Sequence, residues 1–199
     1  MKNIIGLTGP TGSGKSSFCT VAENKGITVI DCDKISREVT QKGSECLNRL
    51  TLAFGEDILA DGSLDRKLLA EKAFSSPDKK QLLEDIIFPF ILCTVMEKIE
   101  KTENDTVILD APTLFESGID EMCGCVVAIL CHPEIREKRI IERDNLSREQ
   151  AKIRMNAGKP DDFYKQRADF ILNSDKPKEE YLKDCEILID KLKEGKDYV

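Results

Sequence analysis

The chain lacks the basic excess of general nucleic-acid-binding proteins, because its 37 acidic residues outnumber its 30 lysines and arginines. A nucleic-acid partner is therefore not expected, since such proteins present a basic patch or stripe. The chain also lacks any apolar run near the ~20 residues that span a bilayer, so no membrane helix is expected. Nor does the N-terminus open a secretory signal. We expect a soluble, cytoplasmic protein and favour a monomer.

A metal-binding or disulfide pattern is missing as well, although the chain contains eight cysteines. No two of them form a C-x-x-C pair, and the closest two are Cys123 and Cys125. Several lie in apolar runs, where a thiol packs as a small hydrophobic group. We therefore expect reduced core thiols. The length of 199 residues fits one α/β domain with at most a smaller subdomain.

The stretch from Gly9 to Ser16, GPTGSGKS, fills every specified position of the phosphate-binding pattern G-x-x-x-x-G-K-[ST]. The pattern needs glycines because its backbone N–H groups must turn toward phosphate oxygens, often at φ values where a Cβ would clash. Lys15 can then reach the β- and γ-phosphates, and the Ser16 hydroxyl can bind Mg²⁺. The expected nucleotide-binding residues here are Gly12, Ser13, Gly14, Lys15, Ser16 and Ser17.

An ordinary glycine-rich turn is the alternative interpretation of this stretch, and the flanking residues argue against it. The apolar run at 3–8 predicts a strand, and Phe18, Val21 and Ala22 have helical spacing within 15–25. Strand, glycine loop and helix is the order that the motif requires. The N-terminus of the helix adds a partial positive charge to the site.

The β-branched run at 27–31 predicts a second strand that ends in Asp31, and Asp33 follows two residues later. In open parallel sheets, ligands bind beyond the carboxyl ends of the strands. Asp33 is ionised at neutral pH and can accept the proton of an acceptor hydroxyl. The residues alone leave an equal alternative, in which Asp33 caps the helix that follows.

Residues 34–101 follow a helical pattern that no strand of the sheet interrupts. A crossover connection needs only about a dozen residues, so this stretch predicts inserted helices that hold the second substrate. Pro89 is expected to kink a long helix there or to set its start. Further strands are expected at 106–110, 125–131 and 168–172, with a terminal helix at 178–192. The fold class is therefore α/β, with a parallel five-stranded sheet and helices on both faces.

An arginine-rich stretch at about 133–160 predicts a lid over the nucleotide. Arg139 and Arg143 lie four residues apart on one helix face, so closure would bring them to the phosphates. The alternative is a solvated charged face, in which both pair with neighbouring acidic residues. Asp110 ends the strand at 106–110 and either holds a Mg²⁺-bound water or caps the loop before Pro112.

The chain resembles the dephospho-coenzyme A kinase family over nearly its full length. The resemblance rests on the opening 6–17, on Asp31-Cys32-Asp33, and on the segments 62–66, 110–116, 139–144 and 168–173. It implies a single P-loop kinase domain over 1–199, with a helical substrate-binding insertion at about 34–101 and a lid at about 133–160. It also implies that ATP, with Mg²⁺, phosphorylates the ribose 3′-hydroxyl of dephospho-coenzyme A to give coenzyme A.

The resemblance favours Lys15, Asp33 and Arg139 as catalytic residues and Arg143 as a nucleotide-binding residue. Two positions depart from the family pattern. Phe88 stands where the family usually has a histidine, and Gly158 stands where a glutamine usually closes the lid segment. We interpret both as local variation, because chemistry at Asp33 requires neither residue.

Two other classes of nucleotide-binding protein share the phosphate-binding pattern. A regulatory GTP-binding switch would also carry D-x-x-G and N-K-x-D, and the chain has neither at the required place. The main alternative is a P-loop kinase that acts on a nucleoside, a nucleotide or another small-molecule hydroxyl.

Overall fold

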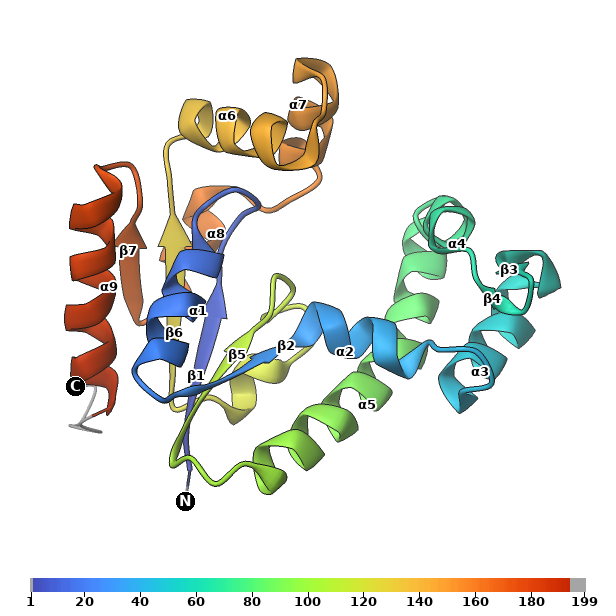
Figure 1. The fold of residues 1–199 in the computed structure, drawn as a ribbon. Helices are drawn as coiled ribbons and strands as arrows, with labels where there is room; N and C mark the ends of the chain where they lie inside the picture. Colours follow the sequence, from blue (N-terminus) through green and yellow to red (C-terminus); the bar gives the residue numbers. More distant parts are fainter. Residues whose placement is uncertain (1, 194–199) are drawn as a thin grey trace. The chain divides into compact units, whose positions relative to one another are not determined.

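A computed structural model describes residues 2–193 of the chain, and its centre is a five-stranded sheet (Figure 1). The strand order is β2-β5-β1-β6-β7, and β1 pairs in parallel with both β5 and β6, as β6 does with β7. The strands are β1 (Asn3–Thr8), β2 (Thr28–Asp31), β5 (Thr106–Asp110), β6 (Cys125–Leu130) and β7 (Phe170–Asn173). The expected parallel five-stranded sheet is confirmed.

Helices cover both faces of the sheet. On one face, α1 (Lys15–Asn24) and α9 (Lys178–Lys193) bury their apolar sides against Ile5, Leu7 and Val127. On the other face, α8 (Asp161–Lys165) packs Tyr164 against Ala128 and Leu130. All six residues of β6 are buried, as expected for a central strand covered on both sides. The sequence pattern did not predict the short helix α8.

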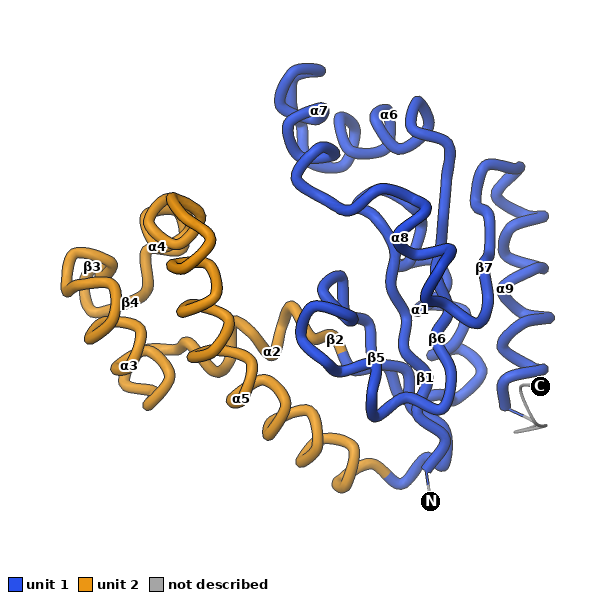
Figure 2. The backbone as a smooth tube through the Cα atoms, turned by 180° about the vertical axis from the view of Figure 1, so that it is seen from behind, with its two compact units in different colours: residues 1–30, 103–199 blue, residues 31–102 orange. Residues whose placement is uncertain are grey.

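The chain divides into two compact units, which Figure 2 shows in separate colours. The sheet unit comprises the residues up to Ile30 and from Glu103 onward, and the helical unit comprises Asp31–Thr102. In the sheet unit, α6 (Pro133–Asp144) and α7 (Arg148–Asn156) follow β6. At the start of α7, Ser147 and Gln150 form a reciprocal capping box. A 3₁₀ turn, η2 (Ile119–Met122), precedes β6.

The helical unit has its own apolar core, which includes Cys46, Leu50 and Ile58. Its elements are α2 (Cys32–Val39), α3 (Glu45–Phe54), η1 (Glu56–Ile58), β3 (Leu59–Ala60), β4 (Ser63–Leu64), α4 (Arg66–Ala73) and α5 (Pro77–Lys101). The strands β3 and β4 form a small hairpin that the sequence pattern missed. Its turn residues Asp61 and Gly62 have φ of 51° and 75°, values that glycine and aspartate tolerate in hairpin turns.

The long helix α5 runs through Pro89, so the expectation that this proline sets the helix start is wrong. The helix begins at Pro77, where the Ser76 hydroxyl accepts a hydrogen bond from the Lys79 N–H at 3.3 Å.

None of the eight cysteines, all within the described residues, forms a disulfide. Over residues 2–193, no helix is long and apolar enough to cross a membrane.

Candidate phosphate-binding and catalytic site

The phosphate-binding loop connects β1 to α1 and packs directly on β6. Gly9 has a φ of 134°, and a Cβ at this position would lie 2.2 Å from the Ile129 carbonyl oxygen. Gly12 has a φ of 77°, and a Cβ there would lie 3.0 Å from the Arg136 carbonyl oxygen. Neither position can hold a side chain without moving backbone. The glycines of the motif are therefore needed both for left-handed φ values and for close approach.

Lys15 begins α1, and its ammonium donates a hydrogen bond to the Gly9 carbonyl at 2.8 Å. The lysine thus folds back over its own loop, within reach of a ligand held by the loop amides. Ser16 is exposed in the first turn of α1. The Ser17 N–H donates to the Gly14 carbonyl at 3.1 Å, which ties the helix start to the loop. Lys15 and Ser16 therefore lie together at one helix N-terminus.

Ser13 differs from its neighbours because it is turned inward. The residue is only 1% exposed, and its N–H donates to the Pro10 carbonyl at 3.2 Å. Gly12, Gly14 and Lys15 are half-buried, and the exposed surface of the two glycines belongs to their backbone. Ser13 is therefore less exposed than the residues on either side of it in the loop.

Arg139 contacts the loop through a backbone carbonyl group and also binds Ser174, after β7. Its guanidinium donates to the Gly12 carbonyl at 3.3 Å, to the Ser174 hydroxyl at 2.7 Å and to the Ser174 carbonyl at 2.8 Å. Arg136, one turn earlier in α6, is 6% exposed and donates to the Thr11 carbonyl at 3.0 Å. Its guanidinium also lies 3.5 Å from the Asp161 carboxylate. The first turns of α6 are thus attached to the loop.

Arg143 lies near the end of α6 and is not brought to the loop. It makes two hydrogen bonds of 2.8 Å to the Asp144 carboxylate, and its side chain is 52% exposed. Its guanidinium lowers the pKa of Asp144, and Arg154 adds to this effect. The arrangement observed is the paired, solvated arginine that the sequence left as the alternative.

Asp31, not Asp33, caps the helix after β2. The Asp31 carboxylate accepts the Lys34 N–H at 2.9 Å, and Asp33 lies within the first turn of α2. The alternative role of Asp33 as an N-cap is therefore wrong, because its neighbour already fills that position. Asp33 belongs to the helical unit, two residues beyond the end of β2 in the chain.

Asp110 ends β5 and accepts a hydrogen bond from the Cys19 thiol, with the sulfur 3.6 Å from Oδ2. Burial raises the pKa of Cys19, and the Asp110 charge raises it further, so this thiol stays protonated at neutral pH. The Ala111 N–H donates to the Leu7 carbonyl at 3.0 Å, so the residues beside Asp110 continue the pairing with β1.

Three residues of the site were missed in the sequence: Arg136, Ser174 and Tyr181. Ser174 lies after β7 and is fully buried, and its hydroxyl donates to the Ser13 carbonyl. Tyr181 of α9 is 3% exposed and donates to the Gly14 carbonyl at 3.0 Å. For Arg136 a signal existed, because it lies three residues before Arg139 on one helix face. Ser174 and Tyr181 carry no motif.

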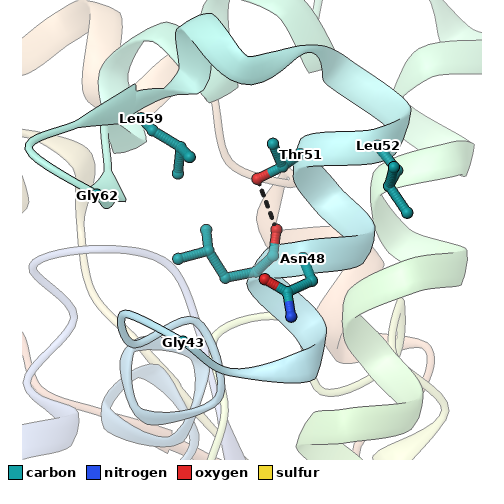
Figure 3. Close-up of a pocket in the computed structure, with 7 residues that line it drawn as sticks. Gly43, Asn48, Thr51, Leu52, Leu59 and Gly62 are labelled. Atoms are coloured by element: carbon teal, nitrogen blue, oxygen red, sulfur yellow. Dashed lines mark hydrogen bonds between the residues drawn. The ribbon is translucent and has the colours of Figure 1, made fainter.

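The helical unit contains a separate pocket of about 310 Å³ (Figure 3). Leu47, Leu52 and Leu59 give it an apolar lining, and Asn48 and Thr51 add polar groups. The Thr51 hydroxyl is engaged with the Leu47 carbonyl at 2.9 Å. An apolar pocket with few polar groups fits the flexible, weakly polar part of a small molecule.

Comparison with known proteins agrees with this geometry. The family model described as dephospho-CoA kinase matches residues 3–180. A dephospho-CoA kinase from Idiomarina loihiensis is 39% identical over 158 residues, which are 79% of this chain and 78% of that protein. The enzyme of the same name from Arabidopsis thaliana is 38% identical over 161 residues, which are 79% of this chain and 69% of that protein.

Two solved structures resemble nearly the whole chain. A dephospho-CoA kinase from Campylobacter jejuni superposes with a TM-score of 0.73 at 29% identity, covering 99% of this chain and 100% of that one. A Thermus thermophilus protein superposes with a TM-score of 0.83 at 30% identity, covering 97% of each chain. Given a family match over residues 3–180, with a complete phosphate-binding loop inside it, this chain belongs to the dephospho-CoA kinase family.

Proposed function

We propose that the protein transfers the γ-phosphoryl group of ATP to the ribose 3′-hydroxyl of dephospho-coenzyme A, giving coenzyme A. The observation that carries this proposal is the complete loop from Gly9 to Ser16 inside a family match that spans residues 3–180. We also propose that it works as a monomer in the cytoplasm. The absence of disulfides among its eight cysteines is what a reducing compartment would give.

On the nucleotide side, the chemistry needs positioning and charge more than covalent steps. Phosphoryl transfer passes through a loose transition state that carries charge on the equatorial oxygens. The Lys15 ammonium would leave the Gly9 carbonyl, 2.8 Å away, and bind the β- and γ-phosphates instead. The loop amides and the N-terminus of α1 would stabilise the same charge.

On the acceptor side, Asp33 would accept the proton of the ribose hydroxyl as the bond to phosphorus forms. A helix cap no longer explains this carboxylate, because Asp31 supplies the cap. A positioned carboxylate base contributes about 10²–10⁴-fold to a rate.

Mg²⁺ fits the residues present if it arrives with the nucleotide. Among the described residues, no group of three histidine, cysteine, aspartate or glutamate side chains could hold a metal alone. Mg²⁺ in kinases keeps several waters and binds substrate phosphates with only one or two protein oxygens. The exposed Ser16 hydroxyl would be such a ligand. Bound there, the ion would neutralise phosphate charge.

Binding of the acceptor would use a pair of arginines in the helical unit. Arg66 donates to the Thr40 hydroxyl at 2.8 Å and to the Arg37 carbonyl at 3.4 Å. Burial lowers the pKa of Arg66, and the charge of Arg37 lowers it further. Within residues 2–193, neither arginine pairs with a carboxylate. An anion between them would relieve the repulsion, and the pyrophosphate of dephospho-coenzyme A is such an anion.

Kinases with other acceptors share the architecture. A shikimate kinase from Acinetobacter baumannii superposes with a TM-score of 0.57 at 15% identity, which shows the fold alone. The acceptor therefore has to be established by experiment.

The test is ATP consumption by the purified chain with Mg²⁺ and a panel of acceptors: dephospho-coenzyme A, adenosine, AMP, shikimate and gluconate. Dephospho-coenzyme A is expected to be the preferred acceptor. Arg66→Met should raise the KM for it about tenfold, the effect of losing one charge-assisted contact. The control Arg49→Met removes an arginine that pairs with Glu45 at 3.0 Å and should leave KM unchanged. Preference for another acceptor would overturn the proposed function.

A further inference from the structure

Four consecutive carbonyl groups of the phosphate-binding loop each accept a hydrogen bond from a side chain outside the loop. Arg136 donates to the carbonyl of Thr11, Arg139 to that of Gly12, Ser174 to that of Ser13, and Tyr181 to that of Gly14. The donors come from α6, from the residue after β7 and from α9. The loop is therefore held from three separate segments.

A held carbonyl also fixes the N–H of the next residue. The peptide unit is planar and trans, so its C=O and N–H point in opposite directions. Donors to the carbonyls of residues 11–14 thus orient the N–H groups of residues 12–15, and hydrogen bonds on the carbonyl side polarise those N–H groups. Of residues 12–15, Ser13 is buried, and Gly12, Gly14 and Lys15 are half-buried.

We propose that Arg136, Arg139, Ser174 and Tyr181 act as a carbonyl clamp, a set of positioning residues that holds the loop amides ready for phosphate before any ligand binds. The clamp rests on the proposed function only in that ATP phosphates are its intended ligand. It assigns Arg139 a place behind the loop, where it fixes the Gly12–Ser13 peptide unit, whose N–H is turned inward to the Pro10 carbonyl. Preorganised donors of this kind cost no rearrangement when charge develops.

The burial of the clamp supports this role. Ser174 is fully buried, Tyr181 is 3% exposed and Arg136 is 6% exposed, so water does not replace their bonds. The side chains also fit closely behind the loop, because a Cβ on Gly14 would lie 3.2 Å from the Ser174 hydroxyl and 3.4 Å from the Tyr181 ring.

The proton of the Ser174 hydroxyl has only one direction available. A guanidinium can only donate, so the Ser174 oxygen accepts from Arg139 and its single proton points to the Ser13 carbonyl. Arg139 also binds the Ser174 carbonyl at 2.8 Å, which fixes the serine backbone. Arg139 and Ser174 thus act as one connected pair on neighbouring loop carbonyls.

The decisive variant is Tyr181→Phe, which removes one hydroxyl and keeps the ring. Its matched control is Tyr164→Phe, because Tyr164 is also buried in the sheet unit and none of its hydrogen bonds reaches the loop. Loss of one such bond corresponds to about a 2- to 10-fold effect. We therefore expect kcat/KM for ATP to fall about fivefold in Tyr181→Phe, while the KM for the acceptor stays within about twofold. The control should change neither.

Two further measurements do not depend on the acceptor. The amide ¹H resonance of Lys15 should move upfield in Tyr181→Phe, because the Gly14 carbonyl loses one of its two donors and keeps only the Ser17 N–H. Affinity for inorganic triphosphate, measured by titration calorimetry, should fall about fivefold. Ser174→Ala should do the same through the Ser13–Gly14 unit.

The outcomes separate the clamp from the proposed function. If wild-type protein does not phosphorylate dephospho-coenzyme A, the proposed function is refuted. The Lys15 resonance and the triphosphate affinity still test the carbonyl clamp, because neither measurement involves the acceptor. If either of these two readouts in Tyr181→Phe equals that of Tyr164→Phe, the clamp proposal is overturned. A purely structural tyrosine would lower the free energy of unfolding without shifting the Lys15 amide selectively.

Discussion

The change Gly9→Ala tests the close packing of the phosphate-binding loop on β6. An added Cβ would lie 2.2 Å from the Ile129 carbonyl oxygen and 3.2 Å from the Ile129 nitrogen. A carbon and an oxygen atom in normal contact lie about 1 Å further apart than the 2.2 Å between this Cβ and the Ile129 oxygen. The loop and β6 must therefore separate. Such overpacking costs about 1–3 kcal/mol, and the φ of 134° adds about 1–3 kcal/mol of strain. We expect the free energy of unfolding to fall by about 2–6 kcal/mol.

The control Gly26→Ala separates these two costs. Gly26 also has a left-handed φ, 75°, but a Cβ there would meet no atom within 4 Å. This variant should therefore lose only about 1–2 kcal/mol. Urea unfolding at 25 °C measures both values, and ATP turnover should fall about 10²-fold in Gly9→Ala, because the loop is displaced by about 1 Å. If Gly9→Ala is as stable and as active as Gly26→Ala, the packing argument is refuted.

Three other predictions concern the acceptor base, the lid and the buried thiols. Asp33→Asn should lower kcat by about 10²–10⁴-fold with little change in ATP affinity. The control Asp31→Asn still caps α2, so its turnover should be nearly unchanged. Normal turnover in Asp33→Asn would show that Asp33 is structural. If residues 133–160 close as a lid, ATP plus acceptor should slow amide hydrogen exchange there, and unchanged exchange would exclude the lid. Burial raises the pKa of Cys185 to about 11 in the folded protein, whereas the thiol of an unfolded chain has a pKa of about 8.5. The stability that comes from the protonated thiol is therefore fully present below pH 8.5 and is lost as the pH rises to about 11. Urea unfolding at pH 8 and pH 10 should show this loss, and Cys185→Ala should reduce the difference; an equal difference in both proteins would refute the assignment.

Much of the sheet was predictable because its strands are short apolar runs with clear ends. The runs at 3–8, 106–110 and 125–131 became β1, β5 and β6 within one residue. The phosphate-binding pattern located the loop because it fixes residue types at fixed spacing. Local signals of this kind need no knowledge of tertiary contacts.

The carbonyl clamp could not be predicted in the same way. Ser174 and Tyr181 reach the loop across 161 and 167 residues of sequence, and neither belongs to a motif. The hairpin at 59–64 was missed because two-residue strands have no measurable alternation. For Asp33, the sequence offered two roles, and only the observed hydrogen bond of Asp31 removed the capping role.

The most direct test of the central claim compares wild-type protein with Lys15→Ala in the ATP-dependent phosphorylation of dephospho-coenzyme A. The product should be identified by ³¹P NMR as the ribose 3′-phosphate. We expect wild-type protein to form this product, and Lys15→Ala to remain folded with turnover at least about 10²-fold lower, because the loop loses its cation. Near-normal turnover in Lys15→Ala, or phosphate at any other position of the product, would contradict the account.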